Sequence, residues 1–141
     1  MQKLALTVAI RRHYTGARLD RSNLHLVSFE CDAVGAIFDQ ADLRGAGMYR
    51  ARLKGARFDK ANLEGAILEC TDLLGASFRS GNLRSVDLEE AVGAADFTDA
   101  NLFGASTYDF EFRLGRSIFC RTVMQDGSIR SDGCLGIADN P

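Results

Sequence analysis

The residues that could do chemistry are few: two histidines, four cysteines and scattered carboxylates. His13 and His25 have no cysteine or carboxylate partners at the spacings typical of a metal site. No serine, cysteine or threonine stands beside a plausible base, and no glycine-rich loop has the context of a phosphate site. We therefore predict that the protein is not an enzyme and that it holds no metal or other cofactor.

Two of the cysteines flank a segment with the pattern of a β-hairpin. Residues 121–124 and 128–130 are strand-like, and Asp126-Gly127 between them is a common turn sequence. Cys120 and Cys134 lie on either side of this segment, so a disulfide could join them across it. The alternative is a pair of reduced thiols beneath a cap. A disulfide in natively isolated protein would favour an oxidising compartment.

Length and charge narrow the class of protein. The chain has 141 residues, which is room for one domain, and a net charge of −2 from 17 basic and 19 acidic residues. This balance does not point to direct binding of nucleic acid. No apolar run approaches the roughly 20 residues that span a bilayer. The apolar residues 1–10 are followed at once by two arginines, which argues against a signal peptide. We expect no membrane contact, and a cytoplasmic location if the chain is complete.

Any site must be positioned by a repeat of five residues. From residue 36 to residue 90 one large apolar residue, the centre, recurs at nearly every fifth position, and a small residue lies two positions before it. Five is neither the helical period of 3.6 nor the strand period of 2, and such self-similarity predicts a solenoid. In each unit, position −1 precedes the centre, and positions +1 and +2 follow it.

Sorted by fours, the centres form columns of similar side chains. The columns are Leu19, Phe38, Phe58, Phe78, Phe97; Leu24, Leu43, Leu63, Leu83, Leu102; Phe29, Met48, Leu68, Leu88, Thr107; and Val34, Leu53, Leu73, Val92, Phe112. Stacked like side chains at every fourth unit predict a coil with four sides. We expect the structural core to include Phe38, Phe58, Phe78, Phe97, Leu43, Leu63, Leu83 and Leu102.

The units at residues 41–45, 61–65 and 100–104 match the consensus A(D/N)LxX, and the chain resembles the pentapeptide-repeat family over about residues 17–114. The resemblance implies an all-β fold, a right-handed quadrilateral β-helix of about five coils. It also implies three parts: an N-terminal cap segment at 1–16, the β-helix at 17–114 and a C-terminal capping tail with a hairpin at 115–141. The tail resembles that of some photosynthetic members, so the periplasm or thylakoid lumen is the alternative location.

Two units are one residue short, at residues 33–36 and 91–94. We expect Gly35 and Gly93 to take the backbone strain there. The short units are either a tolerated deletion or a notch for a partner. In this register Cys31 and Cys70 both take position +2 in the third column. They are then two coils apart, about 10 Å, which is too far for a disulfide.

Outward positions are the candidate surface. An Asn/Asp ladder at −1 beside the Leu column is expected to be structural: Asn23, Asp42, Asn62, Asn82 and Asn101. The third face is predicted to be acidic, with Arg50 as its only base. The candidate partner-binding residues on it are Glu30, Tyr49, Glu69, Asp87, Glu89, Glu90, Tyr108 and Asp109. The alternative is an ordinary solvated surface.

These features favour a non-enzymatic protein–protein interaction or scaffold module of unknown partner. The family resemblance supplies a second hypothesis, a mimic of duplex DNA that binds DNA gyrase or topoisomerase IV and protects them against quinolones. Neither hypothesis includes direct contact with nucleic acid. The sequence is compatible with a monomer or an end-to-end homodimer.

Overall fold

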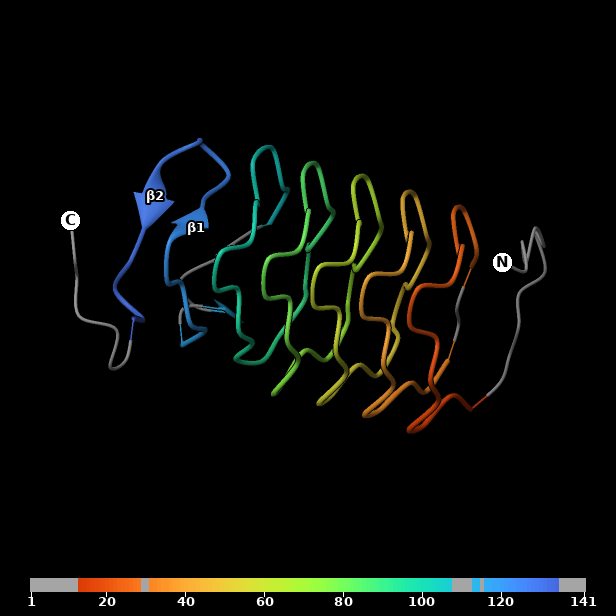
Figure 1. The fold of residues 1–141 in the computed structure, drawn as a ribbon. Coiled ribbons are helices and arrows are strands. Elements are labelled where there is room, and N and C mark those ends of the chain that lie inside the picture. The colour runs from red at the N-terminus through yellow and green to blue at the C-terminus, as the bar shows by residue number, and fades with distance from the viewer. Residues whose placement is uncertain (1–12, 29–30, 108–112, 115, 135–141) are drawn as a thin grey trace.

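The computed structural model of the protein describes residues 13–28, 31–107, 113–114 and 116–134. The chain winds into square coils that stack along one axis, with the N-terminal and C-terminal coils at opposite ends (Figure 1). Each coil pairs in parallel with the next through isolated bridges, such as Asn23 with Asp42 and Asn62 with Asn82. The right-handed quadrilateral β-helix predicted from the sequence is confirmed.

The corners of the square come from a backbone turn that repeats in the five-residue units. The small residue of one unit donates its N–H to the carbonyl of the preceding centre, as Ala61 does to Phe58 at 3.0 Å. The residue at +2 is in the left-handed region, with φ of 58° at Lys60 and 67° at Gly65. Glycine adopts this region without steric cost, which explains its frequency at +2.

The interior of the described coils is a continuous apolar column. Phe38, Phe58 and Phe78 stack with ring centroids 4.8 Å apart, and Phe97 follows at 5.2 Å. All eight predicted core residues have 0–1% of their surface exposed. The small residues two positions before the centres are buried as well and let the backbone close around the core.

The second short unit has a different register from the prediction. Asp72 pairs with Val92, so Val92 takes an outward −1 position and is 43% exposed. Gly93 follows with φ +100°, and a Cβ there would lie only 2.6 Å from the backbone nitrogen of Leu74. The inward placement predicted for Val92 is wrong, because a four-residue unit can omit any of its positions. Gly75 donates its N–H to the carbonyl of Ala94, as Gly55 does to that of Leu74, so Ala94 takes +1, Gly93 takes the centre and the +2 residue is the one omitted.

The first short unit also differs from the prediction. Asp32 pairs with Arg52, so fully buried Ala33 is the centre and Val34 is not. Gly35, with φ +66°, is an ordinary corner glycine like those of the next coils and carries no special strain. The predicted centre at Val34 is therefore wrong by one residue.

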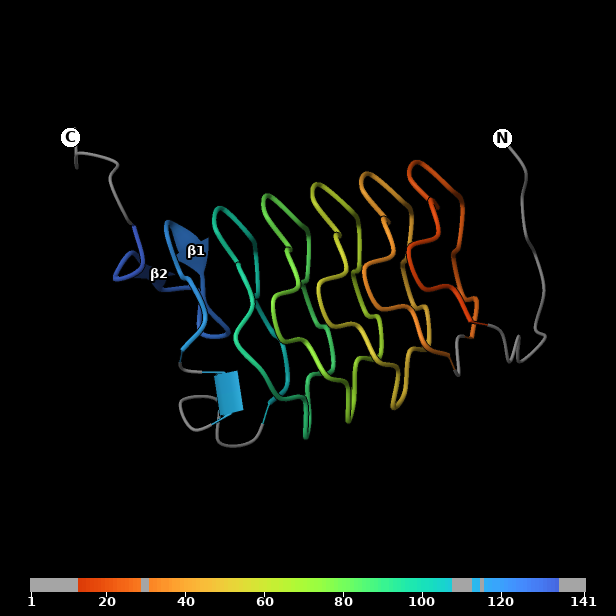
Figure 2. The same cartoon turned by 90° about the horizontal axis from the view of Figure 1, so that it is seen from below.

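At the C-terminal end the coil continues beyond the expected repeat. Phe119 stacks on Phe97 at 5.6 Å and is buried, and buried Met124 follows Leu102 in the Leu column. Strand β1 (Thr122–Val123) then pairs antiparallel with β2 (Ile129–Arg130) in the expected hairpin (Figure 1). Arg113 and Leu114 form a short helical turn, drawn as a small block in Figure 2.

At the N-terminal end His13 pairs with Asp32, so the coils begin before residue 17. The predicted centres Phe29 and Phe112 lie outside the described residues. Within the described ranges, no helix has the length and apolar character needed to cross a bilayer. The same ranges contain no group of three or more potential metal ligands.

Candidate functional site

The third face, which carries the centres Met48, Leu68 and Leu88, presents a column of outward side chains at +1. Tyr49, Glu69 and Glu89 occupy this column in successive coils. The alignment follows from two hydrogen bonds, because the N–H of Arg50 donates to the carbonyl of Glu69 and the N–H of Cys70 donates to that of Glu89. Tyr49 is 40% exposed. Glu30, Tyr108 and Asp109, predicted for the same face, lie outside the described residues.

The acidity of this face is concentrated in two coils. Glu69 makes no ion pair within the described residues, and Asp87 accepts a hydrogen bond only from the backbone N–H of Glu89, at 2.9 Å. Glu90 is different, because Arg113 pairs with it at 2.6 Å. The predicted acidic face therefore reduces to a strip, which we call the acidic strip. It is formed by Glu69 and Asp87, together with Glu89, which takes position +1 in the coil after Glu69.

The other end of the third face is not acidic. The guanidinium of Arg50 lies 5.0 Å from the centroid of the Tyr49 ring, in a cation–π contact. Arg52 stands at the adjoining edge and pairs with Asp32 at 2.9 Å. The expectation of a face with Arg50 as its only base is wrong, because Arg113 also reaches it and Arg52 borders it.

Charges on the Phe face, which carries Phe38 to Phe97 as centres, are mostly paired with each other. Arg57 pairs with Asp39 at 2.5 Å, and Arg121 pairs with Asp99 at 2.6 Å. The Arg121 guanidinium holds the pKa of Asp99 below its usual value. These solvent-exposed pairs contribute little stability each, but they leave little net charge for a partner.

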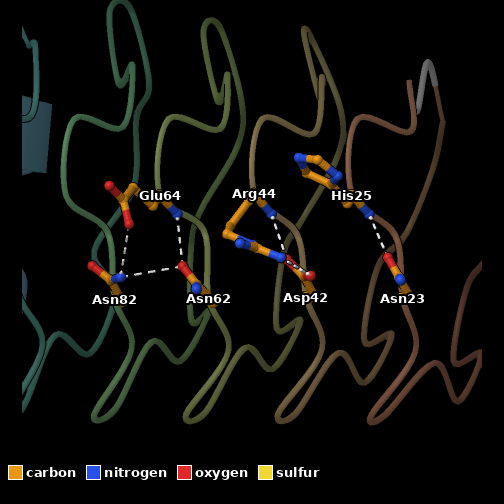
Figure 3. Close-up of polar contacts among 7 residues, drawn as sticks. All are labelled: Asn23, His25, Asp42, Arg44, Asn62, Glu64 and Asn82. Carbon is orange, nitrogen blue, oxygen red and sulfur yellow. Dashed lines mark hydrogen bonds and ion pairs between the residues drawn. The ribbon is translucent and has the colours of Figure 1, made fainter.

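The Asn/Asp ladder of the Leu face is structural, as expected (Figure 3). The side-chain oxygen at −1 accepts the N–H at +1 in each unit, as Asn62 does from Glu64 at 3.2 Å and Asn82 from Arg84 at 3.2 Å. Asp42 also binds Arg44 through two side-chain contacts, which lowers the pKa of its carboxyl group. These bonds fix the turn geometry, and they give the ladder a structural role.

The four cysteines occupy unlike environments. Cys120 and Cys134 form a disulfide. Cys31 and Cys70 are free. Cys70 takes position +2 of the third face as expected, but Cys31 takes the inward position two before Ala33. The prediction for Cys31 is wrong because the missing residue of the first coil precedes it.

The sequence reasoning missed an apolar pair on the fourth face, which carries Leu53 and Leu73 as centres. Leu74 at +1 and Val92 at −1 are each nearly half exposed and belong to neighbouring coils. Val92 was not recognisable as an outward residue without the coil pairing. The period assigns Leu74 to an outward position, but it does not show that Val92 lies outward in the next coil.

Comparison with known proteins identifies the repeat. The sequence pattern described as "Pentapeptide repeats (8 copies)" matches residues 29–59 and 56–92. A search of curated protein sequences finds no match. A solved pentapeptide repeat protein from the thylakoid lumen of Arabidopsis thaliana is 27% identical, with a TM-score of 0.53; the match covers 70% of this chain and 63% of that protein.

HetL, a pentapeptide repeat protein involved in heterocyst differentiation regulation in the cyanobacterium Nostoc, is 26% identical with a TM-score of 0.50; the match covers 84% of this chain and 64% of HetL. The chain thus spans less than two thirds of the length of these two relatives. Full-length QnrB1, a plasmid-mediated fluoroquinolone resistance protein, matches at 16% identity and a TM-score of 0.30, over 76% of this chain and 67% of QnrB1. That likeness carries no argument about function. On its repeats and its solved relatives, the chain belongs to the pentapeptide-repeat family.

Proposed function

We propose that this protein is a non-enzymatic docking module that binds a basic surface of a partner protein through the acidic strip. The observation that carries the proposal is the contrast in charge pairing between faces. Glu69 and Asp87 have no basic partner within the described residues, whereas the Phe face pairs most of its carboxylates with arginines. Complementary charge steers association and selects partners.

The rigidity of the scaffold supports the same proposal. Each side chain of the strip stands on a β-helix whose backbone is hydrogen-bonded to both neighbouring coils. The backbone of such a surface loses little conformational entropy when a partner binds. Exposed Tyr49 in the same column adds an aromatic side chain of the kind enriched in protein interfaces.

Charge reversal tests the proposal. The Glu69→Lys/Glu89→Lys double variant and the wild type would serve as baits, and captured proteins would be quantified at low and high salt. The matched control is Glu64→Lys, because exposed Glu64 takes position +1 in the same coil but on the Leu face. We expect the double variant to lose a partner that the control retains, with weaker salt dependence for any residual binding. Equal capture by all three proteins would refute the strip as the docking site.

Mimicry of duplex DNA is the second candidate. The specific observation in its favour is the acidic strip, which could occupy a DNA-binding groove of DNA gyrase or topoisomerase IV. The measurement is a gyrase supercoiling assay with and without a quinolone. Inhibition or protection that weakens with salt would support this candidate, and no effect at high micromolar protein would leave the general docking function.

We infer an oxidising compartment, the periplasm or the thylakoid lumen, for the protein. Support comes from the disulfide between Cys120 and Cys134, since such bonds persist in oxidising compartments. Alkylation of natively isolated protein tests this inference. Protection of both cysteines before reduction is the expected result, whereas immediate labelling of both would favour the cytoplasm.

A further inference from the structure

A hollow of about 410 Å³ opens at the edge between the third and fourth faces. Its described lining consists of Cys31, Asp32, Tyr49, Arg50 and Arg52. The volume is within the range of small-molecule sites. The acidic strip proposed for docking lies in the following coils and does not line the hollow.

A difference in coil length accounts for the hollow. Ser28 pairs with Gly47, and Asp32 pairs with Arg52. Between these two pairs the chain advances by four residues in the first coil and by five residues in the second. One outward position of the second coil therefore has no counterpart in the first. The space beside that position is left open, and side chains of the longer coil border it.

The described lining residues carry a net positive charge. The Arg50 guanidinium lies over the Tyr49 ring, 5.0 Å from the centroid, and makes no ion pair within the described residues. Arg52 is paired with Asp32 at 2.9 Å, which compensates one of the two guanidinium groups. Among the described lining residues, one positive charge is thus left without a carboxylate.

Cys31, which also lines the hollow, contributes a neutral thiol. Burial, together with the negative charge of Asp32, raises the pKa of Cys31 to about 11. At neutral pH the thiol therefore stays protonated and does not cancel the charge of Arg50.

We propose that this hollow binds the oxyanion group, phosphate or carboxylate, of a small organic anion. A guanidinium offers parallel N–H donors that match the oxygens of a phosphate or carboxylate. The Tyr49 ring already restricts Arg50, so less side-chain entropy is lost when the anion binds. The larger charge of a phosphate predicts tighter binding of a phosphate monoester than of a carboxylate.

The test is a titration of the full chain with phenyl phosphate, inorganic phosphate and benzoate, followed by NMR chemical shifts. The matched control variant is Arg84→Ala, because Arg84 also lies over an aromatic ring, that of Phe103 at 5.1 Å, but on the Leu face. We expect saturable binding of phenyl phosphate that Arg50→Ala weakens about tenfold and Arg84→Ala leaves unchanged. Arg50→Lys keeps the positive charge but loses the parallel N–H donors of the guanidinium. Its affinity for phenyl phosphate should lie between those of the wild type and Arg50→Ala.

Titrations with the three anions distinguish the possible sources of the bound group. Equal affinity for inorganic and phenyl phosphate would assign the hollow to free phosphate, whereas preference for phenyl phosphate would assign it to an organic ester. Absence of saturable binding of all three anions up to about 10 mM would overturn the proposal, as would equal losses in the Arg50 and Arg84 variants. The Glu69→Lys/Glu89→Lys variant should retain anion binding, so failure of the docking proposal would be seen separately.

Discussion

Phe119 stacks on Phe97 with ring centroids 5.6 Å apart and planes 4° apart, although the five-residue pattern is interrupted between them. The contact places the start of the C-terminal tail inside the same apolar column as the repeats. On its other side, the Arg130 guanidinium lies 4.5 Å from the centroid of the Phe119 ring. The last ring of the column is therefore covered by the hairpin that follows it.

Replacement of Phe119 by Ala tests whether the tail and the repeats unfold together. Deletion of a buried Phe side chain costs about 3–5 kcal/mol, and we expect a loss of unfolding free energy near the lower end. Phe58→Ala is the matched variant, because Phe58 has a stacked ring on both sides. Urea denaturation should show a larger loss for Phe58→Ala. No measurable loss for Phe119→Ala would mean that the tail does not contribute to the cooperative core.

Gly93→Ala should destabilise the protein more than Gly65→Ala. Both glycines have positive φ, which costs a residue with a side chain about 1–2 kcal/mol. A Cβ at Gly93 would also lie 2.6 Å from the backbone nitrogen of Leu74, whereas a Cβ at Gly65 would meet nothing within 4 Å. Thermal unfolding of the two variants measures the difference. Equal melting temperatures would show that the short unit can relax away from Leu74.

Loss of the disulfide should destabilise the C-terminal end. Cys120 and Cys134 are 14 positions apart, and closing a loop of this size contributes about 3 kcal/mol. We expect Cys134→Ser to lower the urea midpoint and to speed hydrogen exchange in β2. Cys70→Ser is the control, since Cys70 is a free cysteine outside the hairpin. A midpoint unchanged in Cys134→Ser would indicate that packing alone holds the hairpin.

Stability should fall as the pH drops below about 4. The pKa of Asp99 is lowered, first by its hydrogen bond to Arg121, so its folded-state pKa lies below the ordinary value of 3.8. A carboxyl group with a depressed pKa stabilises the fold above its unfolded pKa, and the contribution is lost as the pH falls through the folded pKa. Solvent exposure of the pair keeps the effect small. Urea midpoints at pH 7 and pH 3 should differ less for Asp99→Asn than for the wild type, and identical differences would contradict this role.

Much of the fold could be predicted from the sequence because every unit of the repeat meets the same physical requirements. Each unit must bury a centre such as Phe58 and turn at a residue such as Gly65, so within five-residue units the period specifies which side chains point inward. The Asn/Asp ladder was predictable for the same reason, since its oxygens bond to the backbone of their own unit.

The acidic strip could be predicted only in part. The period placed Glu69 and Glu89 on one face, because both take position +1 in units that lie four units, or one coil, apart. It could not show that Arg113 neutralises Glu90, since Arg113 lies beyond the regular repeat and reaches the face only through the path of the chain.

The sequence by itself determined the period, the four-sided coil and the identity of most core residues, because these follow from local spacing. Only the tertiary structure decided which residues point inward or outward where the five-residue spacing is interrupted. A four-residue unit fits the period with any one position missing, and the hydrogen bonds between coils select the alignment that turns Val92 outward. The same pairing brings Phe119 back under Phe97 and leaves the hollow beside Arg50, because neighbouring coils, and not neighbouring residues, define those positions.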